Sequence, residues 1–159
     1  MTIEGLLDFP VPFCSSLRHV EFILAIVQPD DEMRSDIFYN SEAGLPGPVD
    51  DNMLPRLIQE LSRLPPDNVI ESIQFRIRYL IREQLSPRTI CEDNWRALKA
   101  LGNGTLPFLK DVQIHVTVED WHGCPENDWI IDRIAAVLAE DSDQGFCLTS
   151  SFEYNWKWE

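Results

Sequence analysis

The sequence predicts an α/β fold in which about four parallel strands form a short right-handed solenoid, with the helices on one side of the sheet. Two observations support this prediction. Three segments repeat one apolar pattern, and segments whose apolar residues have helical spacing alternate with them. A chain of 159 residues is long enough for one compact unit, so residues 1–159 are expected to form a single domain of about four strand–helix repeats.

The three repeated segments share an aliphatic residue, a β-branched residue and a large apolar residue at fixed spacing. These triplets are Leu17, Val20 and Phe22; Ile70, Ile73 and Phe75; and Leu109, Val112 and Ile114. Apolar residues then continue at alternate positions, as a strand with one buried face requires. The expected buried faces are Val20, Phe22, Leu24 and Ile26; Ile73, Phe75, Ile77 and Tyr79; and Val112, Ile114, Val116 and Val118.

The opposite faces of these strands are mixed in character. They include Arg76 and Arg78 in the second strand and His115 and Thr117 in the third. Parallel strands covered on both sides are near-continuously apolar, so these polar residues favour helices on one side only. The first strand, "VEFILAIV", is apolar on both faces and leaves an alternative open: an open α/β sheet with helices on both faces.

Three segments have the start signals and apolar spacing of helices. The expected N-caps are Asp50 or Asp51, Asp93 or Asn94, and Asn127 or Asp128. The last two helices open with Trp95 and Trp129. The step from Trp129 to Phe146 equals the step from Trp95 to Val112, so a fourth strand is expected in which Phe146 is equivalent to Val112.

The segments "NVIESIQFRIRYLI", "CEDNWRALKALGNGTLPFLKDVQIHVTVED" and "NDWIIDRIAAVLAEDSDQGF" resemble the carboxy-terminal, leucine-rich-repeat-like region of F-box-type proteins that are numerous in mushroom-forming (basidiomycete) fungi. The resemblance covers about residues 50–156. It implies a leucine-rich-repeat-like solenoid whose surface binds proteins. In that family an amino-terminal F-box recruits a ubiquitin ligase scaffold. No helical F-box is recognisable before Leu17, so the ligase-adaptor role is not carried over.

Charge and composition exclude several classes of function. The formal net charge of −14 disfavours binding to nucleic acids and to anionic membranes. No apolar run is long enough to span a membrane, and the amino terminus has no basic region typical of a signal peptide, so a cytoplasmic protein is expected. The acidic residues, Glu119 and Asp120 among them, are expected at solvated loop tips and helix caps.

The sequence contains no motif typical of catalysis or of a cofactor site. The four cysteines, Cys14, Cys91, Cys124 and Cys147, are scattered singly and are expected to be reduced and half-buried. The segment from Asp120 through His122 to Cys124 lacks a second pair of metal ligands. We therefore predict no enzyme, no catalytic residue, no metal site and no cofactor.

The candidate partner-binding residues are Arg76, Arg78, His115, Thr117, Trp156 and Trp158. The first four lie on the expected open face. The two tryptophans lie in the tail "EYNWKWE", which continues the last strand and either caps this domain or pairs with another chain to form a homo-oligomer.

Three functions follow, in order of preference. The first is a non-catalytic intracellular module that binds a protein partner through the open face. The second is an acidic inhibitor or immunity-type protein that blocks a basic enzyme, since the net charge of −14 would attract one. The third is a small enzyme with a site beyond the carboxyl ends of the strands, near residues 28–32, 82–84 and 120–124. Neither the partner nor the process is named by the sequence.

Overall fold

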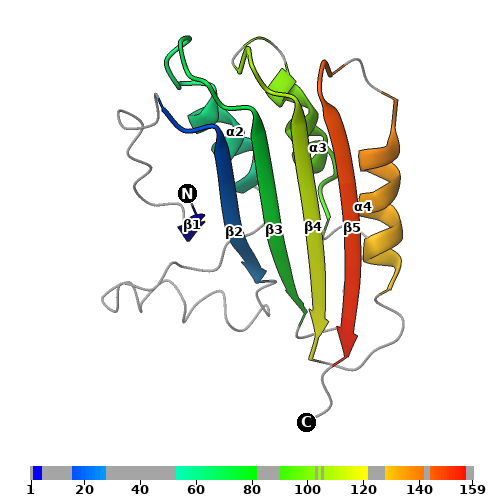
Figure 1. Ribbon diagram of the computed structural model, residues 1–159. Helices are drawn as coiled ribbons and strands as arrows, with labels where there is room; N and C mark the ends of the chain where they lie inside the picture. Colours follow the sequence, from blue (N-terminus) through cyan, green and yellow to red (C-terminus); the bar gives the residue numbers. More distant parts are fainter. Residues whose placement is uncertain are drawn as a thin grey trace.

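The computed structural model describes residues 2–4, 16–27, 53–81, 90–102, 104, 106–121, 128–141 and 144–156. These residues form an α/β fold with one open parallel sheet (Figure 1). The strands follow chain order: β1 (Thr2–Glu4), β2 (His19–Val27), β3 (Ser72–Ile81), β4 (Asp111–Asp120) and β5 (Cys147–Trp156). The four long strands confirm the expected parallel sheet, whereas the three-residue β1 was not anticipated.

The helices α2 (Met53–Leu61), α3 (Glu92–Arg96) and α4 (Trp129–Ala139), and the 3-10 helix η5 (Ala97–Gly102), alternate with the strands. Each helix contacts the next along the sheet, so the helices form one layer on one side of it (Figure 1). With the strands pointing down in the figure and the helices behind, successive strands step to the right, which is the right-handed sense. The described helices thus follow the one-sided arrangement.

The pairing of the strands confirms the repeated pattern. Val20 lies opposite Ile73, which lies opposite Val112. The phenylalanines Phe22 and Phe75 are also partners, and their rings stack with centroids 5.4 Å apart. Equivalent residues of the sequence repeats therefore lie side by side on neighbouring strands.

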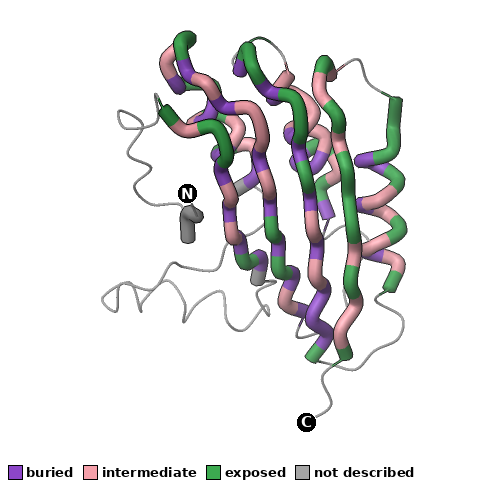
Figure 2. Tube along the Cα trace, viewed as in Figure 1, coloured by how far each residue is buried: buried purple, intermediate pink, exposed green. Residues whose placement is uncertain are grey.

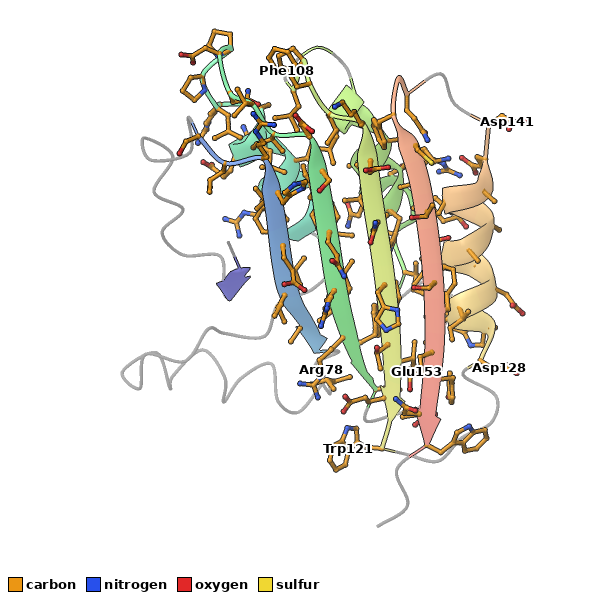
Figure 3. All side chains as sticks on the ribbon, in the orientation of Figure 1. Arg78, Phe108, Trp121, Asp128, Asp141 and Glu153 are labelled. Atoms are coloured by element: carbon orange, nitrogen blue, oxygen red, sulfur yellow. The ribbon has the colours of Figure 1, made fainter. Side chains whose placement is uncertain are left out.

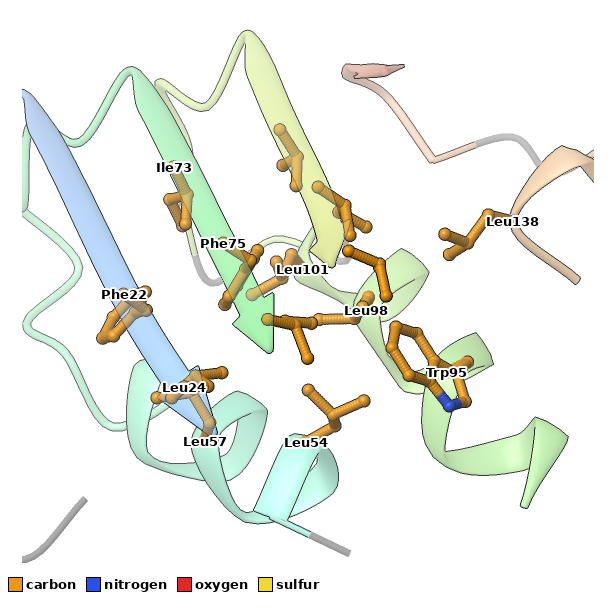
Figure 4. Packing of buried hydrophobic residues seen from close by; sticks show 14 of the residues in the cluster. Phe22, Leu24, Leu54, Leu57, Ile73, Phe75, Trp95, Leu98, Leu101 and Leu138 are labelled. Atoms are coloured by element: carbon orange, nitrogen blue, oxygen red, sulfur yellow. The ribbon is translucent and has the colours of Figure 1, made fainter. Parts of the chain in front are cut away.

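One apolar core fills the space between the sheet and the helices (Figure 4). Residues of β3 and β4 alternate between buried and more exposed positions (Figure 2), as a strand with one covered face does. From the helix layer, Leu54, Trp95 and Leu98 are fully buried against the strands. Trp95 is the largest of the fully buried side chains, which agrees with a structural role for the residue that opens the second helix.

The loops before the strands repeat as well. Each of these loops donates a backbone hydrogen bond to the loop before the preceding strand. Glu71 N–H donates to the Arg18 carbonyl oxygen, Lys110 N–H to that of Glu71, and Cys147 N–H to that of Lys110, each with an N–O distance of 2.8 Å. The side chains of the same positions carry alternating charges. Glu71 lies between Arg18 and Lys110, at 3.5 Å and 3.2 Å, and chiefly the hydrogen bond from Lys110 lowers the pKa of its carboxyl.

Several local expectations were wrong. Leu148, not Phe146, lies opposite Val112, so β5 is shifted by two residues from the expected register. The N-cap of α3 is Cys91, and neither Asp93 nor Asn94 as expected. Both of these residues lie within the helix, which begins at Glu92. Asp128 does precede α4, but its side chain makes no capping hydrogen bond. Asp50, Asp51 and Asn127 lie outside the described residues.

Two expectations about polar residues were also wrong. Cys91 and Cys147 form no disulfide, and both are exposed and not half-buried. Glu119 and Asp120 are buried at the end of β4, with 6% and 0% of their surfaces exposed. Neighbouring side chains therefore cover both residues at the carboxyl end of the sheet, Glu119 beside Arg78 and Asp120 beside Tyr154, and neither lies at a solvated loop tip.

Candidate functional site

The candidate site is the side of the sheet opposite the helices, which we call the open face. Among the described residues no helix or strand covers it. Its side chains are those that alternate with the core residues, and Arg78 and Glu153 mark it in Figure 3. The open face comprises Glu21, Ile23 and Ala25 of β2, Gln74, Arg76 and Arg78 of β3, Gln113, His115 and Thr117 of β4, and Thr149, Ser151 and Glu153 of β5.

The pairing of β3 with β4 brings four of the candidate residues together. Arg76 lies opposite His115, and Arg78 lies opposite Thr117 in the next row along the strands. The four residues therefore form a square at the centre of the open face. Strand β5 extends both rows, because Ser151 lies opposite His115 and Glu153 lies opposite Thr117.

Both arginines of the square are paired with carboxylates. Arg76 Nε lies 2.7 Å from Glu21 Oε1, with 55% of the arginine side chain exposed. Arg78 donates to Glu119 Oε1 from Nε at 3.0 Å and from Nη2 at 2.6 Å, and that glutamate is only 8% exposed. In each arginine, nitrogens on one edge of the planar guanidinium contact a carboxylate. This contact sets the orientation of the whole group, so that its remaining N–H donors point in fixed directions and are available to a partner.

His115 is the centre of a small hydrogen-bonding group. Its Nδ1 lies 2.7 Å from Ser151 Oγ, and its Nε2 lies 3.3 Å from Thr117 Oγ1. The nearest carboxylate oxygen, Oε2 of Glu153, is 3.9 Å from Nε2, beyond hydrogen-bonding distance. A second cross-strand pair of this kind joins His19 Nδ1 to Ser72 Oγ, 2.6 Å apart. These contacts orient the rings and hydroxyls without a carboxylate that would polarise the imidazole.

A shallow depression of about 370 Å³ lies on the open face beside this group. It is lined by residues of β3, β4 and β5: Gln74, Arg76, Gln113, Ile114, His115, Thr149, Ser150 and Ser151. Its side chains offer amides, hydroxyls, an imidazole and a guanidinium. Such a surface can donate and accept hydrogen bonds in several directions, as recognition of polar side chains or of a peptide backbone requires.

The β5 residues of this depression were missed as candidates. The expected fourth strand was described only by its apolar face, although Thr149, Ser151 and Glu153 alternate with those apolar residues. The same period of two therefore placed them on the open face. His19 and Ser72 were also missed. Each is the first residue of its strand, where no preceding alternation indicates that the residue belongs to the strand.

Trp156 does not belong to the open face. It ends β5 on the helix side, is 41% exposed, and packs edge-on against Tyr154 with ring centroids 5.6 Å apart. Trp158 lies outside the described residues. The two groups of candidate residues therefore divide, with the square on the open face and Trp156 at the outer strand.

The carboxyl end of the sheet, where an enzymatic site was considered, is described only in part. Residues 28–32, 82–84 and 122–124 lie outside the described residues. Asp120 is fully buried and accepts a hydrogen bond of 2.6 Å from the Tyr154 hydroxyl, which ties β4 to β5. Trp121 follows it with 41% of its surface exposed, near the end of the strand in Figure 3.

A scan against models of protein families, a search of curated proteins and a search of solved structures each found no match to this chain. Within the described ranges, no three histidine, cysteine or acidic side chains are grouped so that they could hold a metal ion. No described helix has the length and apolarity needed to cross a membrane.

Proposed function

We propose that this protein is a non-catalytic module that binds a protein partner through the open face. The observation that carries the proposal is the square of Arg76, Arg78, His115 and Thr117 on a sheet face that the described helices leave uncovered. A sheet with one apolar face needs only one cover, so the polar face is not required for the core. Its ordered donors and acceptors are then available for recognition.

The hydrogen bonds of the open face support binding over catalysis. The Ser151 hydroxyl touches His115, but the closest carboxylate is too distant to orient the imidazole as a general base. In contrast, Arg76 and Arg78 each have one side fixed and more than half of the side chain exposed. Arginines held in this way lose less conformational entropy on binding, which favours recognition of carboxylates or backbone carbonyls.

The resemblance to leucine-rich-repeat-like regions of fungal F-box-type proteins agrees with such a role and stays a prediction. The cytoplasmic location expected from the sequence is likewise a prediction. The same is true of the identity of the partner, which the proposal leaves to experiment.

A capture experiment tests the proposal. The full chain is immobilised, incubated with extract of its native organism, and the bound proteins are identified by mass spectrometry. The double variant Arg76→Glu/His115→Glu should lose specific proteins that the unchanged chain retains. The matched control is Arg63→Glu, a charge reversal at an exposed arginine beyond α2, which should retain them. Capture of the same proteins by the double variant would remove the open face as the binding surface.

A basic enzyme as the partner is the second candidate, favoured by the net charge of −14. Within the open face and its ion pairs, Glu21, Glu119 and Glu153 outnumber the two arginines. Binding that depends on this charge should weaken steeply as salt is added. Salt-insensitive association with the captured protein would reject the inhibitor role while leaving the interaction module intact.

A further inference from the structure

The depression on the open face carries hydrogen-bonding groups that the described part of the chain does not use. Gln74 lies opposite Gln113, which lies opposite Thr149, so the three side chains form one row across β3, β4 and β5. All three line the depression. Within the part of the chain that the structure describes, none of these side chains makes a hydrogen bond. Their donors and acceptors are therefore available to a bound molecule, which needs only to displace water.

The next row along the strands differs, because its polar groups are already engaged. Arg76 forms its ion pair with Glu21, and 55% of the arginine side chain remains exposed. His115 contacts the hydroxyls of Ser151 and Thr117. The depression therefore combines an unused row of two amides and a hydroxyl with one oriented, exposed guanidinium.

The charge inside the depression is opposite to that of the chain as a whole. Arg76 is the one arginine or lysine among the described residues that line it, and no aspartate or glutamate is among them. The partner of Arg76, Glu21, lies outside the lining, and Glu153 lies one row further along the strands. A carboxylate in the depression would therefore meet a guanidinium and neutral hydrogen-bond donors.

The ends of the depression carry negative charge. Asp111 lies two residues before Gln113 on β4, and Glu153 lies two residues after Ser151 on β5. Both acidic side chains are exposed, and they stand beyond the depression in opposite directions along the strands. An occupant that is complementary to all of these charges has an acidic side chain at its centre and basic residues on both sides.

Building on the binding role proposed above, we infer that the partner presents an extended segment in which an acidic residue lies between basic ones, and that the acidic side chain occupies the depression. Its carboxylate accepts hydrogen bonds from Arg76, while the amides of Gln74 and Gln113 pair with the flanking peptide groups. A glutamine amide donates and accepts hydrogen bonds, as a peptide group does, so it is suited to an extended backbone. A small anion would use the arginine alone and leave the amides without a partner.

Two peptides that differ in one group test the carboxylate. Both are acetylated and amidated pentapeptides, Lys-Gly-Glu-Gly-Lys and Lys-Gly-Gln-Gly-Lys, and each is titrated into the ¹⁵N-labelled full chain while NMR spectra are recorded. The glutamine peptide has one more unit of positive charge, so the net charge of −14 alone favours it. The glutamate peptide should nevertheless bind at least about fivefold more tightly, because its hydrogen bonds to Arg76 are charge-assisted.

The same spectra locate the bound peptide. The side-chain amide signals of Gln74 and Gln113, assigned by their loss in Gln74→Ala and Gln113→Ala, should shift together as the glutamate peptide saturates the chain. Sodium acetate at equal concentration should leave these amide signals in place. Equal or tighter binding of the glutamine peptide, unmoved amide signals with the glutamate peptide, or equal shifts with acetate each overturns the inference.

A charge-matched pair of variants tests the role of Arg76. Arg76→Gln should abolish the preference for the glutamate peptide. Its control is Arg18→Gln, which removes the same charge from an exposed arginine that also lies near a glutamate, Glu71, at 3.5 Å, but outside the depression. This control should retain the preference. Retention of the preference by Arg76→Gln, or its loss from both variants, would contradict a direct contact between Arg76 and the carboxylate.

The proposed function and this inference can fail separately. If Arg76→Glu/His115→Glu loses the captured proteins while the unchanged chain shows no preference for the glutamate peptide, the open face binds proteins by another contact. If the peptides behave as expected while the double variant still captures the same proteins, the depression binds acidic segments but those proteins bind elsewhere.

Discussion

The two faces of the sheet are built from the same strands and have opposite physical character. The helix side carries the buried apolar residues of β2, β3 and β4, where Phe22 stacks on Phe75, and Trp95 of the helix layer is fully enclosed against them. The open face alternates with it residue by residue and carries arginines, amides, a histidine and hydroxyls. Each residue of β3 and of most of β4 therefore lies either in the core or on the open face that we propose for binding, according to its parity.

This division has a consequence for mutational effects. Changes on the helix side should alter the free energy of unfolding and leave recognition unchanged in any molecules that still fold. Changes on the open face should alter recognition with little effect on stability. Neighbouring residues of one strand, separated by a single peptide bond, can be compared directly.

The largest expected effect comes from Phe75→Ala. Phe75 is fully buried and stacked on Phe22, so the substitution removes apolar contacts and leaves a cavity, at a cost of about 3–5 kcal/mol. The adjacent Arg76→Ala should cost less than about 1 kcal/mol, because its ion pair with Glu21 is largely exposed. Urea unfolding followed by circular dichroism measures both. Similar losses for the two variants would contradict the division between the faces.

Gly102→Ala should give the next largest effect. A Cβ atom on Gly102 would lie 1.6 Å from the carbonyl oxygen of Gln144, where the end of η5 meets the segment leading into β5. The backbone would have to separate there, so we expect a loss of about 1–3 kcal/mol. Gly104 is the control for space, since an added Cβ meets nothing within 4 Å, although its φ of 92° favours glycine. An unchanged unfolding midpoint for Gly102→Ala would show that this contact is looser than described.

Tyr154→Phe examines a polar contact on the helix side at the carboxyl end of the sheet. The hydroxyl donates to the fully buried Asp120, and its removal takes one donor from a buried carboxylate, at a cost of about 1–2 kcal/mol. Phe152→Leu, a nearly volume-conserving change on the same side of β5, serves as the control and should cost less. Thermal unfolding compares them. Equal stability of Tyr154→Phe and the unchanged chain would mean that Asp120 does not depend on this bond.

The period of two was sufficient to predict the faces of the strands but not all of their registers. The assignment of Phe22, Phe75 and Ile114 to the core is confirmed because burial depends only on parity. A slip of two residues keeps every side chain on its own face, so the pattern could not separate Phe146 from Leu148 as the partner of Val112.

The candidate site was predicted in composition and only partly in arrangement. Because parallel strands align equivalent positions, the square of Arg76, Arg78, His115 and Thr117 follows from the repeat itself. The ion pairs do not, since Arg76 reaches back to Glu21 and Arg78 forward to Glu119 across neighbouring rows. The partner that a long side chain reaches depends on its rotamer, and the alternation of apolar and polar residues does not predict rotamers.

The smallest expected effect is a pH dependence that arises on the helix side. Arg96 donates to both carboxylate oxygens of Glu140 at 2.9 Å and to Asp93 at 2.8 Å, while Arg133 donates to Glu92 at 2.8 Å. The hydrogen bond from Arg96 lowers the pKa of Glu140, and that from Arg133 lowers the pKa of Glu92. Both carboxyls are thus held charged in the network that joins α3 to α4.

A lowered pKa in the folded state has a definite sign for stability. The folded chain binds protons less readily than the unfolded chain, whose glutamates titrate near 4.5, so the stabilisation is complete above that pH. It is lost as the pH falls through the lowered values. The free energy of unfolding should therefore decline on acidification below about pH 5, more gently in high salt because the network is exposed. Arg96→Met should flatten this decline. An identical pH profile for Arg96→Met would show that this network does not cause the acid sensitivity.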